Sequence, residues 1–300
     1  MIRFLILLTA LLLSTVSADA ANRFAVCVST CTWNTTATWS TTSGGATGAS
    51  VPGSADAAIL DAATCVGGVT CTLTVDATVT VQSITMDLCT ASTTGCILDF
   101  SANNNNVTLS LSFSSTGTGT RTLNMGNGLW TVQGFNNNTW NYTTVTNFTH
   151  NANGSTLSFI PSSATPTGQI NFITGGKTFN IVTHSGVTNA AVFAISAGPT
   201  IATLQFTAPV NARFDSAAPT TVSNAFTWTG TSTNQNYIFS NSDNTSASVS
   251  AASGSTIQWA GIRRMTFTGN TVLAPNSIDL HSNSGVTITA PTGGARIIGG

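Results

Sequence analysis

The stretch "TLTVDATVTVQSITMD", residues 72–87, decides the fold of this chain. Its apolar side chains recur with the spacing of β-strands, in which alternate residues point to opposite faces. The positions between them hold Thr, Gln, Ser and Asp. The pattern therefore predicts strands with an apolar face turned inward and a hydroxyl-rich face turned outward. The apolar residues are Leu73, Val75, Val79, Val81, Ile84 and Met86.

Similar short strands follow along most of the chain, as in "VTLSLSF" (107–113), "KTFNIV" (177–182) and "NAFTW" (224–228). They recur at intervals of about ten to thirteen residues over roughly 220 residues, with Gly, Asn and Ser in the turns. This persistence, with Asn and Thr where stacked coils form side-chain ladders, favours an all-β parallel β-helix (β-solenoid) over residues 64–300. The alternative is two β-sandwich domains, with a boundary near residues 161–166.

The composition excludes several classes of function. Charged residues make up 6% of the chain, with no Glu and one Lys, and the formal net charge is -1. Ordinary soluble proteins have about 25% charged residues. A chain without a basic surface lacks the electrostatic footprint of proteins that bind nucleic acids or acidic membranes. Hydrophobic residues make up 41% and alternate regularly, which is not typical of a disordered chain.

Residues 1–20 have the pattern of a secretory signal peptide. Arg3 precedes an apolar run over residues 4–13, small residues follow, and cleavage is expected after Ala18 or Ala20. The alternative is an uncleaved membrane anchor, but the run is short for a span of about 20 residues. We therefore expect a secreted protein, located outside the cell or on its surface, with no integral membrane span.

The cysteines all lie in the first hundred residues: Cys27, Cys31, Cys65, Cys71, Cys89 and Cys96. Six cysteines in an exported chain predict disulfides, and the sequence alone permits 15 pairings. Pairing each cysteine with its nearest neighbour is the simplest arrangement, because each bond then closes a small loop. A zinc site is disfavoured, because no C-x-x-C occurs and the histidines lie far downstream.

A solenoid needs its ends covered, because an open coil exposes its core and its strand edges. Residues 21–63 are predicted to form such an N-terminal cap, with Trp33 and Trp39 packed over the apolar interior. The last segment, "PTGGARIIGG" (291–300), offers no comparable cap. We therefore expect the solenoid to continue beyond residue 300 or to be covered by a partner.

The predicted cap contains "ATWSTTSGGATGASVPGSADAAILDA", residues 37–62. This segment resembles a motif, W-S-x-x-S-G-G-x-x-G-A-S-V-P, of β-solenoid surface proteins of tailed phages and environmental bacteria. The downstream strands are similar in texture to pectate-lyase-like and adhesin-like parallel β-helices. The resemblance implies a surface-exposed or virion-surface fibre-type protein and no particular reaction. The leader and the cysteines depart from the phage setting and fit a secreted or bacterial surface protein better.

Few residues suggest catalysis. Asp215 lies on a predicted strand with Arg213, and Arg263, Asp279 and His281 fall within about one coil of sequence, so that they could stack into a polar patch. Such a patch could serve a polysaccharide lyase or a glycoside hydrolase, in which carboxylates flank the scissile bond. The preferred interpretation is a surface ion pair.

Calcium is the one cofactor that the sequence leaves open. Asp56 and Asp61 could share it with turn carbonyls. Capping of backbone N–H groups in the turns is the preferred role of both carboxylates.

Two features point to ligands of other kinds. Trp140 and Tyr142, in "NNTWNYT" (137–143), are predicted to be exposed in a loop and are candidates for stacking on sugar rings, whereas Trp130 is predicted to pack inward. Repeated Thr-x-Thr motifs raise ice binding, which requires the motif at the same position of successive coils. In the sequence the Thr positions drift in register, which argues against this function.

The sequence thus favours a secreted or surface-displayed structural and adhesive β-solenoid that binds polysaccharide or a cell-surface glycan. The first alternative is a phage tail-fibre or receptor-binding protein, which predicts a homotrimer or a longer assembly. The second alternative is a polysaccharide lyase or hydrolase, which predicts acidic residues and a base converging in one groove.

Overall fold

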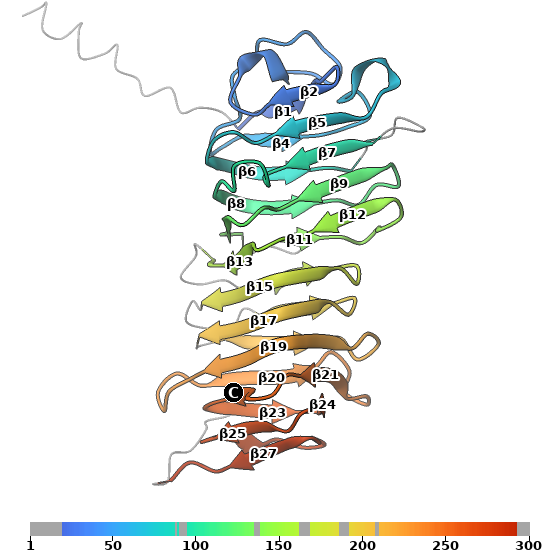
Figure 1. Cartoon of the computed structure of the whole chain (residues 1–300). Helices are drawn as coiled ribbons and strands as arrows, with labels where there is room; N and C mark the ends of the chain where they lie inside the picture. Colours follow the sequence, from blue (N-terminus) through green and yellow to red (C-terminus); the bar gives the residue numbers. More distant parts are fainter. Residues whose placement is uncertain are drawn as a thin grey trace, which may run out of the picture.

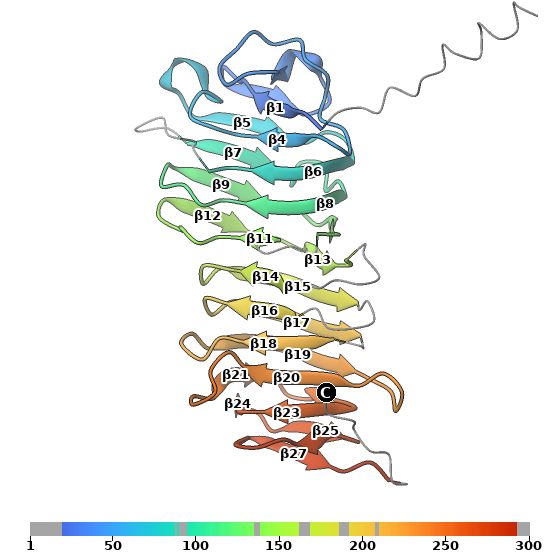
Figure 2. The same cartoon turned by 180° about the vertical axis from the view of Figure 1, so that it is seen from behind.

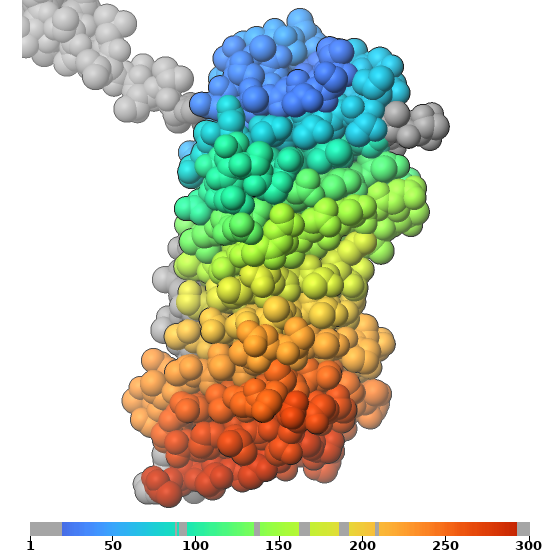
Figure 3. Space-filling model, viewed as in Figure 1, coloured from blue at the N-terminus to red at the C-terminus, as the bar shows by residue number. Residues whose placement is uncertain are grey.

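The computed structural model describes residues 20–87, 89, 95–134, 139–161, 169–185, 192–207 and 210–292. These residues form a parallel β-solenoid, an elongated stack of coils (Figures 1 and 2). Figure 3 shows the stack from outside, with the sequence running in successive bands from one end to the other. The predicted fold class is confirmed. The sandwich alternative is wrong, because strands pair in parallel with strands of the next coil.

Each coil contributes strand segments to three faces, which we call face 1, face 2 and face 3. Face 1 contains β6 (Val79–Thr85), β8 (Val107–Ser114), β10 (Leu129–Val132), β13 (Thr156–Phe159), β15 (Thr178–Ser185), β17 (Thr200–Thr207), β19 (Thr220–Thr229), β22 (Thr256–Ile257), β25 (Val272–Pro275) and β27 (Val286–Thr289). Several of these strands are long enough to turn a corner. β6 and β8 continue onto face 2, and β15, β17 and β19 begin on face 3.

The other two faces consist mostly of short strands. Face 2 contains β1 (Asn22–Ala25), β4 (Ala57–Ile59), β11 (Trp140–Asn141), β14 (Gln169–Ile173), β16 (Val192–Ser196), β18 (Asn211–Phe214), β20 (Asn236–Ser240), β23 (Ala260–Arg263) and β26 (Ile278–Asp279). Face 3 contains β2 (Thr30–Thr32), β5 (Cys71–Thr74), β7 (Cys96–Asp99), β9 (Arg121–Asn124), β12 (Phe148–Asn151), β21 (Ala247–Ala251) and β24 (Met265–Gly269).

Register is maintained by a continuous interior. On face 1, inward residues of successive coils pair directly, and the column from Leu109 through Phe159 to Trp228 is almost fully buried. Phe206 stacks on Trp228 with ring centroids 4.1 Å apart. A shift of one residue would turn these side chains to the outside, so burial fixes the register. Burial of apolar surface stabilises the fold by about 25 cal/mol per Å².

Polar ladders follow the outside of the coils, as the recurrence of Asn and Thr predicts. The Asn151 amide donates to the Asn124 amide oxygen of the previous coil, at 2.7 Å. The Thr183 hydroxyl donates to the Ser158 hydroxyl at 2.9 Å. These bonds link side chains that the backbone register already brings together.

The first coil is closed by the segment that carries the Trp-Ser motif. β3 (Trp39–Ser40) follows a short 3-10 turn, η1 (Thr36–Thr38), and pairs antiparallel with β1, whose other edge pairs in parallel with β4. Trp39 is fully buried, donates from Nε1 to the Trp33 carbonyl at 2.8 Å, and contacts the Trp33 ring edge-on. β1 and β2 already pair in parallel with the second coil, inside the segment that the sequence assigns to the cap.

The three disulfides join Cys27 to Cys31, Cys65 to Cys71 and Cys89 to Cys96, which confirms the nearest-neighbour pairing. Cys27 forms a parallel bridge with Cys65, and Cys71 pairs with Cys96 across neighbouring coils. The bonds therefore lie close together along the corners that lead onto face 3. The second of these corners contains the 3-10 turn η2 (Val66–Gly68).

Candidate functional site

The polar residues near the C-terminal end do not form the patch that the sequence suggests. Asp279 pairs with the buried Ile262, so both side chains point to the inside of the coil, whereas Arg263 is the next residue and points outward. Arg263 forms an exposed ion pair with Asp243, with Nη2 and Oδ1 2.6 Å apart. The two groups thus lie on opposite sides of one strand layer.

His281 is close to Asp279, but through its backbone. Its N–H donates to Asp279 Oδ1 at 2.9 Å, and the Asn283 amide donates to the same oxygen at 2.6 Å. The His281 carbonyl accepts from the Arg264 N–H of the previous coil. Asp279 therefore serves to hold a turn, which is a common role of an Asp side chain at a strand end.

Asp215 lies elsewhere, in the turn after β18. Its carboxylate accepts from the backbone N–H groups of Ala197 and Ala217 and from the Asn241 amide. Asp215 and Asp279 are separated by the strand steps from β18 to β20, β23 and β26, at about 4.8 Å per step. The convergence of acidic residues with a base in one groove, which the lyase or hydrolase alternative predicts, is not found among the described residues.

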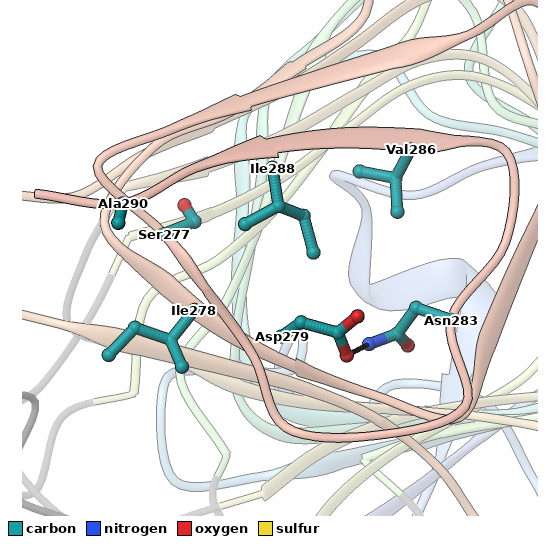
Figure 4. Close-up of a pocket in the computed structure, with 7 residues that line it drawn as sticks. All are labelled: Ser277, Ile278, Asp279, Asn283, Val286, Ile288 and Ala290. Carbon is teal, nitrogen blue, oxygen red and sulfur yellow. Dashed lines mark hydrogen bonds between the residues drawn. The ribbon is translucent and has the colours of Figure 1, made fainter.

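A hollow of about 420 Å³ opens at the last described coil, between β26 and β27 (Figure 4). Val286 and Ile288 project from β27 toward Asp279 and Asn283, which are hydrogen-bonded to each other. Among the described residues, the hollow lies at the cross-section of the last coil. Among the residues that line it, Asp279 is the one carboxylate, so the lining lacks the acid–base pair of a glycosidase.

Asp56 and Asp61 have the turn role that the sequence favours. Asp56 accepts from the N–H groups of Ala21 and Gly53, and its Oδ2 lies 3.9 Å from Arg23 Nε. Asp61 accepts from the Ala63 N–H. No group of three metal-ligating side chains occurs in the part of the chain that the structure describes.

Trp140 and Tyr142 are buried, and their predicted exposure is wrong. Both side chains have 0% exposed surface, and Trp140 stacks on Phe113 with centroids 4.8 Å apart. Their alternation, W-x-Y, is itself an inward strand pattern, and Trp140 pairs with the inward residue Phe172. The neighbouring Asn residues obscured this pattern. Trp130 packs inward, as predicted.

Two partly exposed aromatic residues lie outside the coil on one strand of face 2. In β20, Asn236, Ile238 and Ser240 point inward, whereas Tyr237 and Phe239 are partly exposed. A Cβ atom added at Gly261 of the next strand would lie 3.1 Å from the Tyr237 ring, so this ring covers a glycine. Sequence reasoning missed both residues, although the alternation in "NYIFS" (236–240) contains the signal.

The charged groups beside these rings are arranged in columns. Arg213, Phe239 and Arg263 are direct partners on successive strands, and Asn211 pairs with Tyr237. Arg213 is partly exposed, and it has no hydrogen-bond or ion-pair partner among the residues with described placement. We call the four residues Asn211, Arg213, Tyr237 and Phe239 the aromatic patch.

A second group of ionisable residues comprises the buried Arg121 and the partly exposed Lys177. Arg121 is fully buried and donates to Ser115 Oγ and to the carbonyls of Gly119 and Thr144. Burial lowers the pKa of Arg121, and the charge of Asp87 opposes this shift. Lys177 donates to the Phe148 carbonyl at 2.6 Å, and its pKa is lowered by burial and by Arg121.

Burial favours the neutral form of the two histidines that point into the coil. Burial lowers the pKa of His184 to about 4, although its Nδ1 contacts the Phe159 carbonyl at 2.9 Å. Burial and the charge of Lys177 lower the pKa of His150 to about 3. Both rings lie against aromatic side chains of the core, and His184 is buried whereas His150 is partly exposed.

The helical segments among the described residues are two short 3-10 turns, and neither is long and apolar enough to cross a membrane. The disulfides are consistent with an extracellular protein. No protein-family model, no curated protein and no solved structure matches this chain.

Proposed function

We propose that this protein is a secreted or surface-displayed structural and adhesive module that binds polysaccharide through the aromatic patch on face 2. The observation that carries the proposal is the outward position of Tyr237 and Phe239 on one strand, beside Arg213, whose guanidinium has no ion-pair partner among the described residues. Buried aromatic residues have a structural role in packing the core, whereas aromatic residues on the outer face of a rigid sheet are typical of binding surfaces.

The chemistry of the aromatic patch fits a sugar chain. The face of an aromatic ring packs against the C–H face of a pyranose. This contact buries apolar surface and leaves the hydroxyl groups of the sugar able to form hydrogen bonds. The Arg213 guanidinium and the Asn211 amide provide donors, and the amide oxygen an acceptor, for those hydroxyls. All four side chains project from the same side of two adjacent strands, which hold them at fixed spacing.

The solenoid fits the structural part of the proposal. Its backbone groups pair with the coils above and below, its interior is continuous, and its first edge is closed by β3. Such a rod holds a binding surface at a fixed distance from its point of attachment. With few charges, it offers little to salt-dependent partners.

The test is a glycan-array screen of the purified chain, followed by titration of the best glycan and an assay for new reducing ends. We expect binding without cleavage. The double variant Tyr237→Ala/Phe239→Ala should bind at least tenfold more weakly, because it removes both ring faces. Leu129→Ala is the matched control, because Leu129 is an exposed apolar residue on face 1.

Three results would contradict the proposal. They are the absence of glycan binding, equal affinity of the double variant, and new reducing ends, which would favour the lyase or hydrolase alternative. The same preparation also tests the phage alternative, because a tail-fibre protein should have the mass of a homotrimer in solution.

A further inference from the structure

Face 1 carries a column of hydroxyl side chains whose registration the sequence did not reveal. Residues that point away from the interior are direct partners on successive strands from β6 to β22, and all but one of them are Thr or Ser. Ser158 is 7% exposed, and the others are partly or fully exposed. The column, which we call the Thr ladder, consists of Thr80, Thr108, Thr131, Ser158, Thr183, Gln205, Thr227 and Thr256. The apparent drift of these residues in the sequence reflects coils of unequal length, and the expectation that they are out of register is wrong.

A second column of hydroxyl side chains lies beside the Thr183–Thr227 part of the Thr ladder. Ser185, Thr207 and Thr229 are paired on β15, β17 and β19, two residues further along each strand. The face also presents exposed apolar side chains, of which Leu129 and Leu273 are 42% and 53% exposed. Hydroxyl and methyl groups therefore alternate on one surface.

Face 1 has no charge. The described strands β6, β8, β10, β13, β15, β17, β19, β22, β25 and β27 contain no Asp, Glu, Lys or Arg, and their one His, His184, points inward. Charged residues of the described chain are found instead on the other two faces and in the turns, as with Arg213 and Asp99. A surface of this kind is complementary to an uncharged, hydrogen-bonding partner.

The repeat of the face is regular in two directions. Neighbouring strands lie about 4.8 Å apart, and alternate residues of one strand lie roughly 6.7 Å apart. Both repeats are close to those of oxygen atoms in the lattice of ice. Threonine holds its hydroxyl and methyl groups in few rotamers, because it is branched at Cβ.

The interior beneath the ladder makes the face rigid. The inward residues between the ladder positions are large and buried, and they include Phe159, Phe206 and Trp228. Phe206 and Trp228 stack directly under the Thr183–Thr227 part of the ladder. A rigid face orders the first water layer at little further cost in conformational entropy.

We propose that face 1 binds ice, with the Thr ladder and the Ser185–Thr207–Thr229 column holding water molecules in lattice positions. The occupant is the crystalline water surface itself. It is neutral, and ions are excluded from its lattice, which fits the absence of charge on this face. Each hydroxyl contributes a weak, water-mediated contact, and the repetition of these contacts over many coils supplies the affinity.

Gln205 marks the one irregular position of the Thr ladder. Its long side chain replaces a Thr between Thr183 and Thr227, and it is exposed. The proposal therefore predicts that Gln205→Thr strengthens ice binding. A role of these residues in folding alone predicts no gain.

The experiment measures inhibition of ice recrystallisation, thermal hysteresis and partition into growing ice with the full secreted chain, its disulfides intact. We expect activity in the unmodified chain, at least a fivefold loss in Thr227→Lys and higher activity than the unmodified chain in Gln205→Thr. Thr122→Lys is the matched control, because Thr122 is also half-buried and faces outward, on β9 of face 3. Thermal melting of each variant checks that the fold is retained.

The proposal is overturned if the unmodified chain neither inhibits recrystallisation nor partitions into ice, or if Thr122→Lys loses as much activity as Thr227→Lys. Its outcome is independent of polysaccharide binding. The aromatic patch lies on face 2, and the Tyr237→Ala/Phe239→Ala double variant should retain full ice activity.

Discussion

Trp39→Ala tests whether the N-terminal segment seals the solenoid. Trp39 has 0% exposed surface, contacts the Trp33 ring at 4.8 Å and donates a 2.8 Å hydrogen bond to the Trp33 carbonyl. Truncation of a buried Trp to Ala costs about 3–5 kcal/mol, because it removes transfer free energy and leaves a cavity. We expect a loss of that size in the free energy of unfolding.

Trp39→Phe separates the hydrogen bond from the packing. The Phe ring keeps an edge-on contact with Trp33, which is worth about 0.5–1.5 kcal/mol, but it leaves the Trp33 carbonyl without its donor. An unsatisfied buried acceptor costs about 1–3 kcal/mol. We therefore expect the free energy of unfolding of Trp39→Phe to lie between that of the unmodified chain and that of Trp39→Ala.

The assay is denaturant unfolding followed by far-ultraviolet circular dichroism, combined with hydrogen exchange of the β1 and β4 amides. Val28→Ala, at a residue that is 70% exposed in the same region, serves as the control and should change stability by no more than about 0.5 kcal/mol. A loss below about 1 kcal/mol in Trp39→Ala, with unchanged exchange of β1, would refute the sealing role.

Three further predictions concern stability. Replacing Cys65 and Cys71 by Ser should lower the free energy of unfolding by about 2 kcal/mol, as expected for a short closed loop, and chemical denaturation with and without reductant measures it. Burial holds the pKa of His184 at about 4 against 6.5, so the unfolded chain binds the extra proton between these values. As the pH decreases from 6.5 to 4, His184 should therefore contribute a fall in stability of up to about 1.4 kcal/mol per pH unit, in addition to that of His150, and His184→Phe should remove its share of the slope measured by denaturation at each pH. Gly134→Ala should prevent normal packing, because its Cβ would lie 1.8 Å from a backbone oxygen of the adjacent coil, whereas Gly53→Ala, with a nearest contact of 3.7 Å, should leave the melting temperature within a few degrees.

The alternation of polar and apolar residues was sufficient to predict the fold class. Stretches such as residues 72–87 and 107–113 leave one consistent arrangement, in which a long series of short strands buries one face each. The short spacing of the cysteines likewise limited each disulfide to a local loop, as in Cys65–Cys71. Both predictions depend on residues that are close together in the sequence, so they could be made without knowledge of the tertiary structure.

The candidate sites were less predictable, because they depend on which coil position each residue occupies. Asp279 and Arg263 are close in sequence, but strand alternation turns the Asp279 side chain toward the inside of the coil and the Arg263 side chain toward the outside. Trp140 resembles a loop residue beside its Asn neighbours, yet pairing with Phe172 turns it inward. Tyr237 and Phe239 resemble core residues, yet the same alternation turns them outward.

The amino-acid sequence by itself thus determined that this chain is a β-solenoid with local disulfides and an almost uncharged surface, because period-two burial, cysteine spacing and composition are local properties. The tertiary structure alone decided which outward residues share a column. Coils of unequal length place Thr183 beside Gln205 and Thr227, and Arg213 beside Phe239. That registration is set by the packing of the interior residues of neighbouring coils, so it cannot be counted along the chain.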